Sequence, residues 1–186
     1  MSRPASLRQM LPLGKAEWAE AEAAMHPIRL ANGEVFVREG DVARRVGVIE
    51  EGIVRYHVLR DGREHVTGFD AEGEVAGDFA SFFEGSAAVH TIEAVGPCVL
   101  RVLTREAFDD LARRFPALAG VRSAVAETLW VGERVRAAEA QQLTAEERYR
   151  RLLERSPHLV QRVPLYHIAS YLGVTPEALS RIRARI

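Results

Sequence analysis

The segment VPLYHIASYLGVTPEALSRIRARI, residues 163–186, predicts two short helices joined by a sharp turn. Gly173 can adopt the left-handed conformation that ends the first helix. Thr175 and Pro176 are suited to the N-cap and the first position of the second helix. The positions expected to be buried are all apolar: Ile168, Leu172, Val174, Leu179 and Ile182. This spacing is typical of a helix-turn-helix.

The same segment lies in the basic part of the chain. Residues 141–186 contain 8 Arg and 4 Glu, a net charge of +4, whereas residues 1–140 contain 17 Arg and Lys against 22 Asp and Glu, a net charge of −5; the two parts sum to −1. Since phosphate groups attract cationic side chains, this charge favours double-stranded DNA as a partner of the two helices. The alternative is a pair of amphipathic helices that only caps the fold.

Five side chains of the second helix are predicted to contact DNA. Arg181 can donate two hydrogen bonds to guanine, and Glu177 can accept one from cytosine. Thr175, together with the N-terminus of the helix, can bind a phosphate. The full candidate set is Thr175, Glu177, Ser180, Arg181 and Arg183.

Residues 28–104 predict a small antiparallel barrel or jelly roll. Turns that contain glycine interrupt short apolar segments about every 8 to 12 residues. The clearest hairpin is expected at Asp61-Gly62, because glycine supplies the positive φ of a tight turn. The other expected turns are at Asn32-Gly33, Gly40-Asp41, Glu51-Gly52 and Glu72-Gly73.

From Arg105 onward the apolar residues repeat with a helical period. Pro116 is expected to open a long helix, and Thr144 to cap the next one, which ends at Ser156-Pro157. The apolar stripe of the long helix comprises Leu118, Val121, Val125, Thr128, Gly132 and Val135. We interpret this stripe as the seam of a homodimer, with packing against the barrel as the alternative.

The resulting fold class is α+β. We expect an N-terminal jelly-roll effector domain in residues 1–115, a long dimerisation helix in 116–140, and a helix-turn-helix domain in 141–186.

No apolar run is long enough to span a membrane, and no signal peptide is recognisable. A cytoplasmic protein without a membrane partner is therefore expected. Cys98 is the only cysteine, which excludes an intrachain disulfide and a four-thiolate metal site, and the sequence assigns it no redox role.

The order of these parts resembles the Crp/Fnr family of bacterial transcription regulators. The resemblance is carried by LANGEVFVREGD (30–41), VIEEGIVRYHV (48–58), DGREHVTGF (61–69), GDFASFF (77–83) and IASYLGVTPEALSRIRARI (168–186). It implies a cyclic-nucleotide-binding-like domain, a homodimer joined along the long helix, and a two-fold DNA site whose half-sites are about one helical turn apart. RNA polymerase is a further candidate partner.

Two features depart from the family pattern at the DNA-binding end. The sequence stops at Ile186, so we expect no wing after the second helix. Pro176 stands where cyclic-AMP-responsive members carry an arginine that reads guanine. The sequence specificity is therefore expected to differ.

A third departure concerns the effector pocket. In members that bind cyclic AMP, a Gly-Glu-Leu segment is followed about ten residues later by an Arg-Ser pair that holds the phosphate. Here Gly77-Asp78-Phe79 matches the first part, but the second reads Ala88-Val89 or Val89-His90. The candidate ligand-binding residues are Gly77, Asp78, Phe79, Val89, His90 and Thr91.

The missing cation argues against cyclic AMP as the effector. A buried phosphate without a cationic partner costs several kcal/mol of desolvation. We expect either a different effector or a cavity filled by side chains of the protein itself, and no cofactor. Four arginines flank the predicted strands, but nothing in the sequence places any of them in the pocket: Arg55, Arg60, Arg63 and Arg101.

Two other function classes are alternatives to a DNA-binding regulator. One is a regulatory module that binds a nucleotide or small molecule and controls a protein partner instead of DNA. The other is a metal-dependent jelly-roll enzyme. For the latter, His57, His65 and His90 do not form a His-x-His pair followed closely by Glu. Neither a nucleophile with its base nor a phosphate-binding loop is recognisable, so catalysis and a metal site are not expected.

Overall fold

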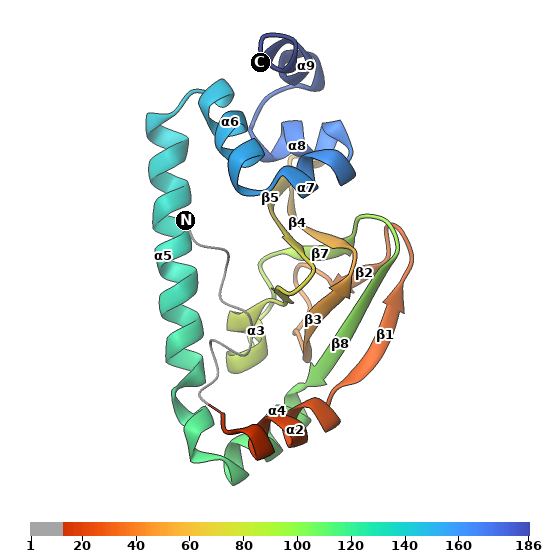
Figure 1. Cartoon of the computed structure of the whole chain (residues 1–186), viewed down its shortest axis with the longest axis vertical. Coiled ribbons are helices and arrows are strands. Elements are labelled where there is room, and N and C mark those ends of the chain that lie inside the picture. Colours follow the sequence, from red (N-terminus) through yellow and green to blue (C-terminus); the bar gives the residue numbers. More distant parts are fainter. Residues whose placement is uncertain (1–12) are drawn as a thin grey trace.

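The computed structural model describes residues 13–186, in which a β domain lies beside a long helix and beneath a bundle of short helices (Figure 1). Two four-stranded antiparallel sheets form the β domain. One has the order β1 (His26–Leu30), β8 (Cys98–Thr104), β3 (Arg45–Glu51), β6 (Val75–Ala76); the other has the order β2 (Val35–Val37), β7 (Thr91–Ala94), β4 (Ile53–Arg60), β5 (Arg63–Ala71). The expected jelly roll is confirmed.

Alternating apolar residues of the two sheets face one another and form the core of the β domain. Val54, Ile92, Leu100 and Val102 are almost completely buried in it. This alternation is what a sheet with one face on the core and one toward solvent requires.

The predicted hairpin at Asp61-Gly62 is present between β4 and β5. Asp61 and Gly62 have φ values of 51° and 73°, and Arg60 pairs with Arg63. Two successive positive φ values give the primed turn that fits the twist of paired strands.

A second glycine turn brings the only cysteine into contact with its neighbours. A Cβ on Gly52 would lie 2.5 Å from Sγ of Cys98, so no other residue fits there without movement. The thiol of Cys98 donates to the carbonyl oxygen of Ile53 over 3.0 Å, and the residue is 2% exposed.

Three helices cover one end of the β domain: α2 (Lys15–Ala23), α3 (Phe79–Glu84) and α4 (Arg105–Arg114). Pro116 opens a separate 3₁₀ turn, η1 (Pro116–Gly120), and not the long helix as expected. The long helix α5 (Val121–Gln142) begins after Gly120 and ends beyond the expected boundary at 140. Proline is compatible with the first position of either helix type, so its presence alone does not choose between them.

The interpretation of the apolar stripe was wrong for its first half. Leu118, Val121 and Val125 are buried in a cluster with Phe82 and Leu111 of the same chain. Leu118 of η1 and Val121 and Val125 of α5 therefore fix η1 and the start of α5 to α3 and α4. Nowhere in residues 13–186 is a helix both long and apolar enough to cross a membrane.

The C-terminal bundle consists of α6 (Ala145–Arg155), α7 (Pro157–Arg162), α8 (Leu165–Tyr171) and α9 (Pro176–Arg183). Thr144 caps α6 as predicted: its hydroxyl accepts from the amide of Glu147, whose carboxylate accepts from the amide of Thr144. Such reciprocal capping fixes where the helix begins.

The turn between α8 and α9 also forms as predicted. Gly173 has a φ of 68°, and the hydroxyl of Thr175 accepts from the amide of Ala178 over 3.2 Å. Pro164 precedes α8 as its N-cap. The helix-turn-helix is thus specified by local residues.

The bundle packs on the β domain through α8 and β5, as Figure 1 shows. Ile168, Leu172 and Leu179 share one buried cluster with Ile53 and Ala71 of the sheet. The two expected domains therefore share a hydrophobic interface within one chain.

Candidate effector site and nucleic-acid interface

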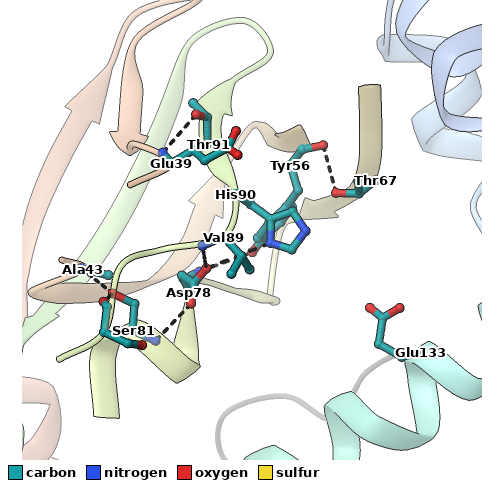
Figure 2. A network of polar contacts seen from close by, with 12 residues as sticks. Glu39, Ala43, Tyr56, Thr67, Asp78, Ser81, Val89, His90, Thr91 and Glu133 are labelled. Carbon is teal, nitrogen blue, oxygen red and sulfur yellow. Dashed lines mark hydrogen bonds and ion pairs between the residues drawn. The ribbon is translucent and has the colours of Figure 1, made fainter. Parts of the chain in front are cut away.

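Asp78 is at the centre of the candidate effector site. It is the N-cap of α3, and its Oδ1 accepts from the amide of Ser81 over 3.0 Å. Its Oδ2 accepts from the amide of Val89 over 2.9 Å. The residue is 7% exposed, so both carboxylate oxygens are held by the backbone of this chain (Figure 2).

His90 borders the same carboxylate. Its Nδ1 lies 4.0 Å from Oδ2 of Asp78, and about a third of its side chain is exposed. The ring of Tyr56 approaches it edge-on, with 6.2 Å between ring centroids. Val89 exposes 57% of its surface, so only its amide is directed toward Asp78.

The remaining predicted residues serve other contacts. The amide of Gly77 donates to the hydroxyl of Tyr56 over 3.2 Å. Phe79 stacks with Phe83 in the apolar cluster between α3 and α4. The hydroxyl of Thr91 accepts from the amide of Glu39 over 3.1 Å (Figure 2). The structure therefore brings together Asp78, His90 and the Val89 amide, and not Phe79 or Thr91.

Tyr56 is a site residue that the sequence did not indicate. Its hydroxyl donates to Oδ2 of Asp70 as well as accepting from Gly77. Burial, together with the nearby charge of Glu74, raises the pKa of the Asp70 carboxyl to about 7. The tyrosine thus links the segment before α3 to an acid that gains a proton near neutral pH.

This geometry disfavours a phosphate at the start of α3. Backbone amides at a helix start are the donors that a phosphate uses, but here the carboxylate of Asp78 already accepts from one of them, the amide of Ser81. The arginines of the neighbouring strands are engaged elsewhere: Arg60 with Glu39, and Arg101 with the carbonyl oxygen of Glu22. An anionic ligand would meet a buried negative charge without a guanidinium.

An apolar cavity of about 60 Å³ lies elsewhere, between α2, α3, α4 and the start of α5. Phe79, Phe82, Phe83 and Phe108 line it, and neither Asp78 nor His90 does. It is smaller than the roughly 150 Å³ that accommodates benzene-sized molecules, so we regard it as a packing gap.

The candidate DNA-contacting residues lie together on the exposed side of α9. Thr175, Glu177, Ser180, Arg181 and Arg183 are all exposed, while Leu179 is buried against α8. Spacings of three and four residues put Glu177, Ser180 and Arg181 on one face of the helix. The structure thus presents these side chains as one surface.

The arginines of this surface differ from most arginines of α6 and α7. Arg150, Arg151 and Arg162 form ion pairs with Glu146, Glu139 and Glu72. Among residues 13–186, by contrast, Arg181, Arg183 and Arg185 have no carboxylate within ion-pair distance. Their charges are available to an external anion.

Comparison with known proteins finds a family model that is similar to the β domain. Residues 27–115 match the model of the cyclic nucleotide-binding domain. No curated protein sequence matches the chain significantly. Metal-ligating side chains do not gather in groups of three or more in the described part of the chain.

Solved structures resemble the chain over most of its length. FixK2 from Bradyrhizobium japonicum is 23% identical, covers 87% of this chain and 83% of its own, and superposes with a TM-score of 0.73. The catabolite activator protein of Thermus thermophilus is 22% identical, with coverages of 94% and 84% and a TM-score of 0.59. The c-di-GMP-responsive global regulator CLP of Xanthomonas campestris is 18% identical, with coverages of 92% and 91% and a TM-score of 0.63.

Proposed function

We propose that the chain is a DNA-binding transcription regulator, because residues 27–115 match the model of the cyclic nucleotide-binding domain and its fold is similar to those of FixK2 and the catabolite activator protein. The observation that carries the proposal is the exposed face of α9. Three arginines that form no ion pair with any other residue of 13–186 follow a helix start capped by Thr175. This is the arrangement in which a second helix enters the major groove.

We assign separate roles to the residues of that face. Arg181 reads guanine in the major groove, and Glu177 accepts from cytosine. Thr175 and the start of α9 bind a backbone phosphate, and Ser180 and Arg183 add contacts alongside.

A mobility-shift series with duplexes selected from a randomised pool tests this proposal. Affinity should fall steeply with salt, because bound phosphates release counterions. Arg181→Ala should weaken binding by about 5- to 150-fold and relax the preference at one base pair. Arg113→Ala, which removes an exposed arginine of α4 that pairs with Asp110, is the control and should bind like the wild type.

The proposal fails if the protein shows no salt-dependent binding to DNA, or if Arg181→Ala and Arg113→Ala behave alike. Either outcome would favour a regulatory module that controls a protein partner through the same helices.

We also propose that the effector is not cyclic AMP. Support comes from Asp78, whose carboxylate takes the amides of Ser81 and Val89 that a phosphate would need. CLP is described as responsive to c-di-GMP, so within this fold the effector varies. Titration calorimetry with cyclic AMP should give a Kd weaker than about 100 µM, and micromolar binding would contradict the assignment.

A homodimer through α5 completes the proposal. Leu129, Trp130 and Val131 are consecutive apolar residues of α5 that remain exposed, and Trp130 exposes 63% of its surface. Large apolar side chains that stay exposed on one stretch of a helix favour an interaction surface there. A two-fold partner would place two α9 helices on one duplex.

A further inference from the structure

A buried arginine connects the β domain to the helix-turn-helix. Arg55 of β4 is 4% exposed. Its Nε and Nη2 donate to Oε1 of Glu93 on β7 over 3.3 and 3.0 Å. Its Nη1 donates to Oε2 of Glu64 on β5 over 2.6 Å and lies 3.2 Å from Nδ1 of His167 on α8. One guanidinium on β4 thus contacts two other strands, β5 and β7, and the first helix of the helix-turn-helix.

The contact with His167 requires a neutral imidazole. A guanidinium only donates, so Nδ1 of His167 accepts and its proton resides on Nε2. Burial, and secondly the charge of Arg55, lower the pKa of His167 to about 4. A proton on Nδ1 would face the guanidinium directly and break the contact.

All charged and titratable groups around His167 belong to the same cluster. Arg55 and His57 face it from β4, Glu64 from β5, and Glu93 from β7. The ring of the neighbouring Tyr166 lies 4.0 Å from the imidazole, centroid to centroid. The two carboxylates raise the pKa of His167, but burial and Arg55 outweigh them.

His57 adds a second titratable group on the sheet side. Its Nε2 lies 3.5 Å from Oε2 of Glu93, and neither ring nitrogen has a hydrogen-bond partner in the described chain. Burial, followed by Arg55, lowers its pKa as well. Both histidines therefore favour the packed arrangement only while they are neutral.

Two further contacts near Arg55 join β5 to α8. The amide of Val66 on β5 donates to the hydroxyl of Ser170 on α8 over 3.0 Å. Phe69 and Tyr171 meet edge-on, with 5.6 Å between ring centroids. The amide of Val66 is thus protected by a side chain of α8. Its rate of hydrogen exchange therefore reports whether α8 is packed on β5.

The strands that reach Arg55 also carry the candidate effector site. Glu93 follows His90 by three residues, on the strand that begins at Thr91. Tyr56, whose ring borders His90, is the neighbour of Arg55 on β4. A displacement of β7 at the site moves Glu93, a partner of Arg55, and a displacement of β4 moves Arg55 itself.

We propose that Arg55 is the joint that couples the effector domain to the helix-turn-helix, and that protonation of His167 releases it. The coupling to DNA rests on the function proposed above, whereas the joint itself does not. Because one guanidinium bridges Glu93 and His167, a change at the effector site and a change in pH act on the same contact.

The direction of the pH effect follows from the pKa of His167. The free imidazole has a pKa near 6.5 and the packed one about 4, so packing is fully stabilised above pH 6.5 and weakens as the pH falls toward 4. At about pH 5.5 this single group weakens the domain contact about tenfold relative to pH 8.

Hydrogen–deuterium exchange of the full-length protein, corrected for the intrinsic pH dependence of exchange, tests the joint. Peptides covering 63–70 and 164–172 should exchange about tenfold faster at pH 5.5 than at pH 8. His167→Asn, which retains an acceptor near the place of Nδ1 but does not titrate, should remain protected at both pH values. Arg55→Met should expose both peptides at both pH values.

Two controls separate the joint from general destabilisation. Arg60→Met removes an exposed arginine of the same strand and should leave both peptides protected. A peptide covering β8 should exchange alike in all variants. If Arg55→Met does not fold, His167→Phe, which keeps a ring but lacks the acceptor, should expose the two peptides instead.

The joint is refuted if Arg55→Met exchanges like Arg60→Met, if His167→Phe stays protected at pH 8, or if His167→Asn keeps the full pH response. These measurements contain no DNA. A protein that shows the predicted exchange but fails the mobility-shift test would retain the joint and lose the proposed function.

Discussion

Gly77 offers a residue-level test of how the site segment packs. A Cβ at this position would lie 2.7 Å from Cγ1 of Val46, closer than packed carbon atoms allow. Gly77→Ala is therefore expected to lower the free energy of unfolding by about 1–3 kcal/mol, measured by urea denaturation.

Gly68→Ala is the matched control for this prediction. Its Cβ would meet nothing closer than Cδ2 of Tyr56 at 3.9 Å, so its effect should stay within about 0.5 kcal/mol. Equal destabilisation by the two substitutions would show that Gly77 is not held by Val46.

Asp70 gives a second prediction at the scale of one residue. Its pKa is raised to about 7 in the folded protein, so folding favours the protonated acid. The protonated Asp70 carboxyl stabilises the folded protein fully below the pKa that Asp70 has in the unfolded chain. This contribution to the free energy of unfolding is lost as the pH rises toward 7. Asp70→Asn stays neutral and can still accept from Tyr56.

We therefore expect Asp70→Asn to be more stable than the wild type at pH 8, by about 1–2 kcal/mol, and nearly equal to it at pH 4. The gain is smaller than the pKa shift alone implies, because the residue is only partly buried. Urea titrations at the two pH values measure it, and a wild type that is more stable than the variant at pH 8 would contradict the assignment.

At the scale of elements, α5 combines two surfaces. Val121 and Val125 hold its first turns to the chain's own core, whereas Leu129, Trp130 and Val131 remain exposed. If the proposed homodimer forms through α5, Trp130→Asp should weaken it by at least about tenfold without unfolding the chain. Sedimentation velocity over a concentration series measures the change.

Leu59→Asp is the control for the dimer prediction. It introduces the same charge at another exposed apolar residue, on the β4–β5 hairpin. The dimer contact would have to lie elsewhere if the two variants sedimented like the wild type.

Elements that depend on neighbouring residues were predictable from the sequence. The Asp61-Gly62 hairpin, the Thr144 cap and the Gly173 turn each require only residues a few positions apart. Pro116 misled because proline opens a 3₁₀ turn as readily as an α-helix.

The site depended on contacts that the sequence does not encode locally. The Val89 amide and the Asp78 carboxylate are 11 residues apart, and Arg55 and His167 are 112 apart. The sequence indicates Asp78 as a candidate site residue. That its two carboxylate oxygens accept from the amides of Ser81 and Val89 follows only from the way α3 packs beside the segment around Val89. Pairs of this kind are fixed by tertiary packing.

At the scale of the whole molecule, an acidic part and a basic part pack against each other. Residues 13–140 contain 15 Arg and Lys against 22 Asp and Glu, a net charge of −7, and residues 141–186 have a net charge of +4. The ion pair between Arg162 and Glu72 joins α7 of the basic part to the turn after β5 in the acidic part. The charge opposition favours packing of the two parts, while the arginines of α9 remain outside it.

The burial of Cys98 gives the molecule a chemical probe of its own. The thiol of Cys98 packs against Gly52 and the carbonyl oxygen of Ile53. Burial raises the pKa of this thiol above that of a free cysteine. Ellman's reagent should thus label the native protein at least about 1,000-fold more slowly than the denatured chain. Labelling that is equally fast in both would show that the Gly52 turn opens locally. Since no other thiol competes, the labelling rate distinguishes a variant that has lost one contact from a variant that has lost its fold.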